Sequence, residues 1–299
     1  MKQVHIISPS GCIDPTLIDG AAERLTQWGY TVTIAPHAYD QYGRFAGTAT
    51  DRLTDINNAF ADTHNDIILC SRGGYGLQQI ADKIQVPEFP DNTHRPLLVG
   101  FSDITILHNI LALKQIPSLH ASMCKYIATL PDDDPALHML RRALSGEKMH
   151  YDLPAHPLQR IGTATGKLIG GNLSVLYGLQ GTPYALSRII DQQTIPVILF
   201  IEDIAERHYH IDRMMHNLKM SGVLQRLGGL VVGQMTDCND DTSMGCSVLQ
   251  TIQQAVAEYD YPVLFNFPAG HVPQNKPLLL NTTWTLNITT QQATLTQVQ

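Results

Sequence analysis

Short apolar runs alternate with amphipathic segments along the first hundred residues of the chain. The apolar runs at residues 4–7, 66–70 and 97–99 are each followed by a turn rich in glycine or serine. Between them, apolar side chains recur at helical spacing over residues 15–28 and 51–60. This alternation of strand and helix patterns predicts a mostly parallel β-sheet with helices on both of its faces.

The second half of the chain has a different pattern. A length of 299 residues exceeds what one compact core usually holds, so two domains are expected. We predict an N-terminal α/β domain at residues 1–145, a linker at 146–165 and a C-terminal domain at 166–299. Within this last part, the apolar run at 196–201 predicts a buried strand. Alternating polar and apolar residues from residue 278 onward predict two antiparallel strands.

Composition excludes several classes of protein. The formal net charge is −7 and no cluster of lysine and arginine occurs, so we expect no nucleic-acid partner. The sequence contains no run of about 18 apolar residues, so no membrane span is expected, and no signal peptide is expected from the first residues. The 5 cysteines are irregularly spaced and form no Cys-x-x-Cys pair, so neither a disulfide framework nor a structural zinc site is expected. A cytoplasmic location is the expectation that follows.

The turn Gly100-Phe101-Ser102-Asp103 lies where a predicted strand meets a helix. Such an elbow exposes the serine hydroxyl above the sheet and aims the N–H of the next residue, Asp103, at an oxyanion. Ser102 is therefore a candidate nucleophile. The hydrolase elbow usually has a second glycine after the serine, where this chain has Ile104. The alternative is that Ser102 caps the following helix.

A second turn, Ser71–Gly76, contains three glycines after a predicted strand. It lacks the Lys-Ser/Thr ending of a phosphate-binding P-loop. We therefore favour the interpretation that the N–H of Gly73 or Gly74 is a second oxyanion donor. Arg72 is a candidate for binding a substrate carboxylate, since its planar guanidinium suits that group. A structural ion pair is the alternative role for Arg72.

A serine nucleophile needs a histidine as base and an acceptor that fixes the histidine tautomer. Glu202 and Asp203 end the apolar strand at 196–201, and either carboxylate could be that acceptor. Among 13 histidines, His271 is the better candidate base because it follows a rigid Phe-Pro-Ala-Gly turn. The pair His208 and His210 is a weaker candidate for a metal site, because no acidic or cysteine partner lies at a helpful spacing.

The order of these turns resembles that of the LD-carboxypeptidases, the murein tetrapeptide carboxypeptidase family of serine peptidases. The matching segments are Ser8–Gly11, Arg44–Thr48, Arg72–Gly76, Gly100–Asp103, Gly170–Leu173, Glu202–Ile204, Asp212–Met215 and Gly270-His271. Two stretches depart from the family pattern. His120-Ala121-Ser122-Met123 replaces His-Gly-Pro-Met, and Pro277–Asn281 replaces a Leu-Pro-Leu-Gly-like stretch.

The resemblance implies a triad of Ser102, Glu202 and His271, with oxyanion donors from Asp103 and the loop of Gly73 and Gly74. It implies a flavodoxin-like N-terminal α/β domain, a C-terminal, mostly β (swivelling β/α) domain, and an active site between them. The implied reaction is hydrolysis of the bond between an L-centre residue, meso-diaminopimelate or L-lysine, and a terminal D-alanine in a murein tetrapeptide, during peptidoglycan recycling. A cytoplasmic homodimer without metal or cofactor is also implied.

Three other functions are compatible with the same residues. A microcin C immunity-type peptidase would have the same fold and cut an amide in an aminoacyl-nucleotide. A non-catalytic muropeptide-binding protein would keep the pocket without the reaction. A nucleotide-binding α/β protein would use the turn at Arg72–Gly76 as a phosphate loop.

Overall fold

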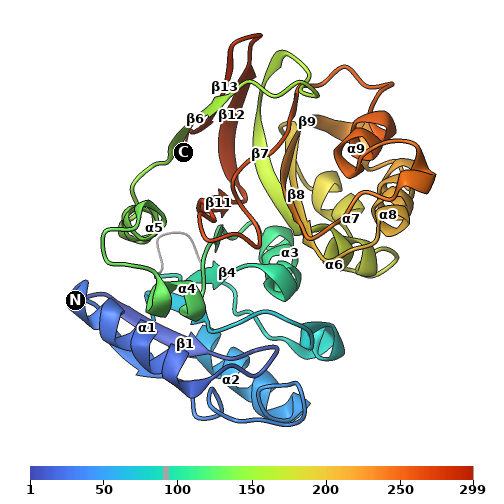
Figure 1. Cartoon of the computed structure of the whole chain (residues 1–299). Helices are drawn as coiled ribbons and strands as arrows, with labels where there is room; N and C mark the ends of the chain where they lie inside the picture. Colours follow the sequence, from blue (N-terminus) through green and yellow to red (C-terminus); the bar gives the residue numbers. More distant parts are fainter. Residues whose placement is uncertain (90–93, 299) are drawn as a thin grey trace.

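The computed structural model describes residues 1–89 and 94–298, and two β-sheets form its framework (Figure 1). The first sheet has six strands in the order β11-β5-β4-β3-β1-β2. Its strands are β1 (Gln3–Ile7), β2 (Thr31–Ile34), β3 (Ile67–Cys70), β4 (Leu97–Gly100), β5 (Ser118–His120) and β11 (Leu278–Leu280). Strands β1 to β5 are parallel, and their order is that of a flavodoxin-like fold, which confirms the predicted N-terminal architecture.

Five helices accompany this sheet: α1 (Pro15–Gln27), α2 (Ala49–Ala61), α3 (Thr105–Leu113), α4 (Cys124–Thr129) and α5 (Pro135–Ser145) among the residues that the structure describes. Local sequence explains where they begin. The carboxylate of Asp14 accepts the Thr16 N–H at 2.9 Å at the start of α1, and Thr48 and Asp51 form a capping box at the start of α2. Helix α1 packs on α4, whereas α3 packs against the second sheet.

The second sheet has seven strands in the order β10-β9-β8-β7-β12-β13-β6. They are β6 (His150–Pro154), β7 (Gly162–Asn172), β8 (Val197–Ile204), β9 (Leu227–Thr236), β10 (Val263–Leu264), β12 (Thr282–Ile288) and β13 (Gln292–Gln297). Strands β7 to β10 are parallel. Strands β12 and β13 are antiparallel, as the alternation after residue 278 predicts. Helices α6 (Leu173–Gly178), α7 (Leu186–Asp191), α8 (His208–Met220) and α9 (Val248–Ala255) gather on one side of this sheet (Figure 1).

The chain passes between the two sheets three times, the last time directly after β11, where β12 continues in the second sheet. It first crosses between α5 and β6, so the segment predicted as a linker, residues 146–165, contains the edge strand β6 and the start of β7. It returns after β10, because β11 pairs antiparallel with β5 of the first sheet. The apolar run of β11 gives no sign of its partner, since pairing between distant segments is a property of the whole fold. His271 lies on this returning segment, between the sheets.

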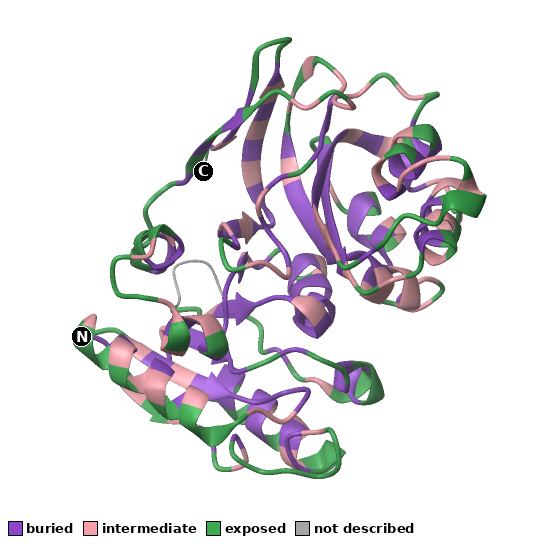
Figure 2. Cartoon of the chain, in the orientation of Figure 1, coloured by how far each residue is buried: buried purple, intermediate pink, exposed green. Residues whose placement is uncertain are grey.

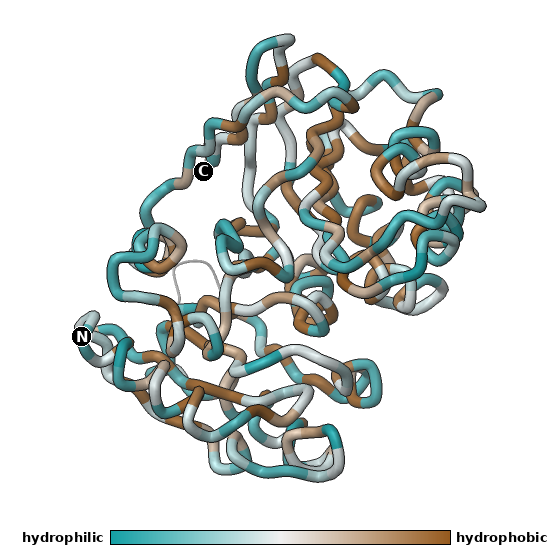
Figure 3. Tube along the Cα trace, viewed as in Figure 1, coloured by the Kyte–Doolittle hydropathy of each residue, from teal (hydrophilic) through white to brown (hydrophobic). Residues whose placement is uncertain are grey.

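Buried apolar side chains form two clusters, and both sheets lie among the buried parts of the chain (Figure 2). The larger cluster packs the first sheet against its helices and extends to the facing side of the second sheet, where it includes Phe200 of β8 opposite Leu119 of β5. The smaller one lies between the seven-stranded sheet and its helices and includes Leu199 and Ile201 of β8. The hydrophobic segments of β8 and its neighbours stand out in Figure 3. Because successive side chains of a strand point to opposite faces, Glu202 is expected on the same face as Phe200, toward the first sheet.

Candidate active site

Ser102 lies at a sharp turn between β4 and α3. Its φ of +68° is in the left-handed region, which non-glycine residues rarely adopt and which is concentrated at functional sites. A Cβ on Gly100 would lie 2.9 Å from Cγ1 of Ile104, so the turn needs glycine there. Ser102 opens a short 3-10 helix, Ser102–Ile104, and makes no side-chain capping bond to it or to α3. The elbow geometry is therefore present, and the capping alternative is not.

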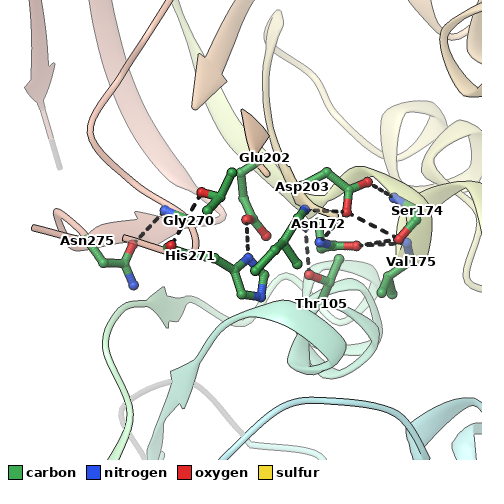
Figure 4. Close-up of polar contacts among 11 residues, drawn as sticks. Thr105, Asn172, Ser174, Val175, Glu202, Asp203, Gly270, His271 and Asn275 are labelled. Atoms are coloured by element: carbon green, nitrogen blue, oxygen red, sulfur yellow. Dashed lines mark hydrogen bonds and ion pairs between the residues drawn. The ribbon is translucent and has the colours of Figure 1, made fainter. Parts of the chain in front are cut away.

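His271 and Glu202 form the second part of the site (Figure 4). His271 Nδ1 lies 2.8 Å from Glu202 Oε2, and Glu202 is fully buried. Since a carboxylate only accepts hydrogen bonds, Nδ1 is the donor of this contact, which leaves Nε2 as the ring nitrogen available to act as the base. The contact is close because Gly270 has a φ of +122° and no side chain. A Cβ at that position would lie 2.7 Å from Glu202 Oε2.

Asp203, the other carboxylate that the sequence left open, points away from His271. Its Oδ1 accepts from Asn172 Nδ2 at 2.9 Å, and its Oδ2 accepts from the Ser174 N–H at 2.8 Å (Figure 4). Burial, and then the neighbouring charge of Glu202, raise the pKa of Asp203 to about 7. Asp203 therefore holds the start of α6, and Glu202 alone faces the imidazole.

Ser102 and His271 line one cavity of about 660 Å³. The cavity is also lined by Arg72, Gly73 and Gly74, so the structure brings together the turns from β3 and β4 and the segment that follows β10. Within residues 1–89 and 94–298, no hydrogen bond joins the Ser102 hydroxyl to His271. Such bonds are often long without substrate. The His271 ring also packs edge-to-face against the ring of Phe101, with the two ring centroids 4.9 Å apart.

The glycine loop after β3 lies directly against the serine. A Cβ on Gly73 would lie 2.8 Å from Cβ of Ser102, which places the Gly73 backbone beside the hydroxyl. Gly74 has a φ of +103°, and the Gly73 carbonyl accepts the Gly11 N–H at 3.0 Å. Arg72 is exposed, donates to the Cys12 carbonyl at 2.5 Å and has no salt-bridge partner in the described part of the chain. The predicted alternative of a structural ion pair for Arg72 is therefore not what the structure contains.

The side chain of Asp103 has a structural task. Its Oδ2 accepts the Ser10 hydroxyl and the Leu77 N–H, the latter at 3.0 Å, and burial raises the pKa of this carboxyl. These bonds tie the turns after β1 and β3 to the elbow. Any catalytic contribution of Asp103 therefore comes from its main chain.

Sequence analysis missed Arg52, which performs a similar task. Arg52 is buried on α2 and donates to the carbonyls of Pro9 and Gly76 at 3.1 and 2.9 Å. Gly76 ends the glycine loop that lines the cavity, and Pro9 belongs to the neighbouring turn, whose Gly11 N–H bonds the Gly73 carbonyl. An arginine on an amphipathic helix is ordinarily solvated, so nothing in the sequence pattern distinguishes this one.

The two histidines considered for metal binding are engaged elsewhere. His208 is buried and bonds the Thr251 hydroxyl at 2.7 Å, and it accepts the Asp241 N–H at 3.1 Å. His210 pairs with Glu206 at 2.9 Å. The described residues contain no cluster of three or more histidine, cysteine, aspartate or glutamate side chains able to hold a metal ion. No helix within the described part of the chain is long and apolar enough to cross a membrane.

A serine on a strand–helix elbow, a histidine paired with a buried carboxylate and a shared cavity between two α/β units are typical of serine hydrolases. Residues 4–121 match the family model for the LD-carboxypeptidase N-terminal domain, and residues 165–286 match that for the LD-carboxypeptidase C-terminal domain. The chain therefore belongs to the LD-carboxypeptidase family, as its turns suggest.

Named relatives and solved structures agree with this family. A probable murein peptide carboxypeptidase of Bacillus subtilis is 32% identical over 90% of this chain and 83% of its own length. The murein tetrapeptide carboxypeptidase of Pseudomonas aeruginosa is 28% identical over 92% of this chain and 89% of its own. Muramoyltetrapeptide carboxypeptidase from Oxalobacter formigenes has the same fold, with a TM-score of 0.83 at 23% identity over 100% and 99% of the two chains. The microcin C7 self-immunity protein has a TM-score of 0.79 at 16% identity over 99% and 96%.

Proposed function

We propose that the chain is a serine carboxypeptidase that removes the terminal D-alanine from murein tetrapeptides. The scissile bond joins the L-centre of meso-diaminopimelate or L-lysine to D-alanine. The observation that carries the proposal is the pairing of His271 with the buried Glu202, with His271 lining the same cavity as Ser102 at its elbow. Family membership and the named relatives supply the substrate class.

In this mechanism, Nε2 of His271 takes the proton of the Ser102 hydroxyl while the oxygen attacks the scissile carbonyl. Glu202 orients the imidazole and stabilises its protonated form. The imidazolium then gives its proton to the leaving nitrogen, which releases D-alanine. Water, deprotonated by His271, next attacks the acyl-enzyme and frees the tripeptide and the serine.

The oxyanion of each tetrahedral intermediate needs donors that are in place beforehand. We assign this role to the N–H of Asp103 and to an N–H of Gly73 or Gly74. The close packing of the Gly73 backbone on Ser102 supports the assignment. Arg72 lines the cavity, and its bond to the Cys12 carbonyl uses only one of its guanidinium N–H groups. We therefore assign it the role of binding the terminal carboxylate of the substrate.

The family resemblance also supports a cytoplasmic location and a homodimer, both of which are part of this proposal. Light scattering of the purified chain tests the dimer directly. A mass of one protomer at micromolar concentration would contradict it.

The test of the reaction is mass spectrometry of L-Ala-γ-D-Glu-meso-diaminopimelate-D-Ala after incubation with the chain and with Ser102→Ala. Loss of one D-alanine with the parent alone is the expected result. The fold shared with the microcin C7 self-immunity protein favours one second candidate, cleavage of an aminoacyl-nucleotide amide. Intact tetrapeptide together with a cleaved aminoacyl-nucleotide would replace the first function with the second.

A further inference from the structure

One buried hydrogen bond joins the two sheets close to the proposed active site (Figure 4). The N–H of Asn172 donates to Oγ1 of Thr105 at 3.0 Å, and both residues are buried. Thr105 is the first residue of α3 and lies three residues after Ser102. Asn172 is the last residue of β7 in the second sheet. The bond therefore connects the helix that follows the nucleophile to the sheet that carries Glu202.

On the second sheet, the bond leads directly to Glu202. Asn172 is the register partner of Glu202 in the parallel pairing of β7 with β8. The Asn172 side chain also bonds Asp203, the next residue along β8. The position of Asn172 is thus fixed relative to Glu202, and Glu202 in turn holds His271.

Gly171 allows the two sheets to come this close, and Gly170 allows β7 to lie close to β8 within the second sheet. Gly171 has a φ of +146°, and a Cβ there would lie 2.4 Å from Oγ1 of Thr105. Gly170 has a φ of +131°, and a Cβ there would lie 1.9 Å from the Phe200 carbonyl oxygen. Any other residue at these positions would push β7 away from α3 or from β8. The Gly-Gly-Asn sequence therefore sets a fixed, short distance between the two halves of the site.

We infer that Thr105 is a positioning residue for the reaction, whose hydroxyl sets the distance between Ser102 and the Glu202–His271 pair. The inference rests on the roles given to these three residues in the proposed function. Thr105 is fully buried and is not among the residues that line the cavity, so it acts through the placement of the sheets and not on the substrate. Displacing a reacting group by about 1 Å costs on the order of a hundredfold in rate.

The test compares Thr105→Val with the parent at a temperature well below unfolding. Valine keeps the shape and removes the acceptor of the Asn172 N–H. We expect kcat for D-alanine release to fall by about 10- to 100-fold with KM changed less than about threefold. Thr105→Ser keeps the hydroxyl and should restore kcat to within about threefold of the parent.

Thr251→Val is the matched control. The Thr251 hydroxyl of α9 is also buried and hydrogen-bonded, but its partner is His208 of α8, so this bond does not join the two sheets. This substitution should lower the melting temperature and leave kcat unchanged. A folded Thr105→Val variant with parental kcat would overturn the inference, and so would an equal loss of kcat in Thr251→Val. If valine prevents folding, Thr105→Ala and Gly171→Ala test the same contact with the same expected loss.

The rate at which a fluorophosphonate labels Ser102 separates this inference from the proposed substrate. Labelling requires the serine and histidine to be aligned but requires no tetrapeptide recognition. A parent that is labelled quickly and leaves tetrapeptide intact would refute the substrate alone. Slower labelling of Thr105→Val would then still support the positioning role, and equal labelling would refute it.

Discussion

Replacing Gly270 by alanine should lower kcat for D-alanine release by about a hundredfold in a chain that still folds. The new Cβ would lie 2.7 Å from Oε2 of Glu202 and 3.0 Å from its Cβ, whereas ordinary contacts begin at 3.4 Å. The carboxylate oxygen must therefore move by about 0.7 Å, a displacement beyond the tolerance of roughly 0.5 Å for a working site. The strand cannot easily move instead, because β8 is paired on both sides, with β7 and with β9.

The displaced atom is the one that holds the base. His271 Nδ1 lies 2.8 Å from Glu202 Oε2, and a shift of about 0.7 Å can lengthen this contact beyond hydrogen-bonding range. The expected hundredfold loss corresponds to about 2.7 kcal/mol of transition-state stabilisation. Alanine at a φ of +122° also adds backbone strain of about 1–3 kcal/mol, which should appear as a lower melting temperature.

Gly146→Ala separates the two effects. Gly146 ends α5 with a φ of +91°, and no heavy atom lies within 4 Å of the position where its Cβ would be. This variant should lose a comparable amount of stability and keep the parental kcat. Steady-state release of D-alanine and thermal unfolding are measured for both variants. A folded Gly270→Ala variant with parental kcat, or an equal loss of kcat in Gly146→Ala, would refute the reasoning.

Three further outcomes follow from the site. Glu202→Gln should lower kcat by about 10³- to 10⁴-fold, because an amide can donate to Nδ1 and favour the wrong imidazole tautomer; kcat with normal thermal stability checks this. Arg72→Ala should raise KM by about 10- to 100-fold for the tetrapeptide but not for its C-terminal amide, which has no terminal carboxylate to bind. Burial lowers the pKa of His108 from 6.5 to about 4, so the neutral ring contributes stability that is complete above pH 6.5 and is lost as the pH falls toward 4. His108→Gln should therefore flatten the fall in melting temperature over this range, and parallel curves for variant and parent would contradict the assignment.

The pattern of the sequence predicted the N-terminal fold because its information is local. Apolar runs of three to five residues that alternate with amphipathic segments are enough to indicate a parallel sheet. The elbow at Ser102 was also local, since Gly100 two residues earlier is needed where Ile104 folds back on the turn. Strand β11 was missed as a member of the first sheet, because Leu278–Leu280 shows only that it is apolar and not which strand it pairs with.

The choice between Glu202 and Asp203 shows what local information lacks. A strand period of two places the two carboxylates on opposite faces of β8, but it does not say which face His271 occupies. The structure answers this because Phe200, two residues before Glu202, packs in the core between the sheets. The face toward the first sheet is also the face toward Ser102. The family resemblance had supplied the same answer without the physical reason.

The segment that carries His271 is anchored in both sheets. It leaves the second sheet at β10 and enters the first at β11, where Leu278 pairs with His120 at the end of β5. Strand β5 is in turn paired with β4, the strand that leads to Ser102. Directly after β11, the Asn281 N–H donates to the Leu168 carbonyl of β7 at 2.7 Å, so the chain joins the second sheet again.

Near the site, one sheet therefore cannot slide past the other without breaking the bond from Asn172 to Thr105 or the bond from Asn281 to Leu168. The distance from Ser102 to His271 is therefore determined by the packing of the two sheets against each other. The segments that fix it lie far apart in the sequence, so the distance cannot be predicted from any one motif. This is why each motif is weak evidence for the reaction when taken alone, and why their common placement at one cavity is strong evidence.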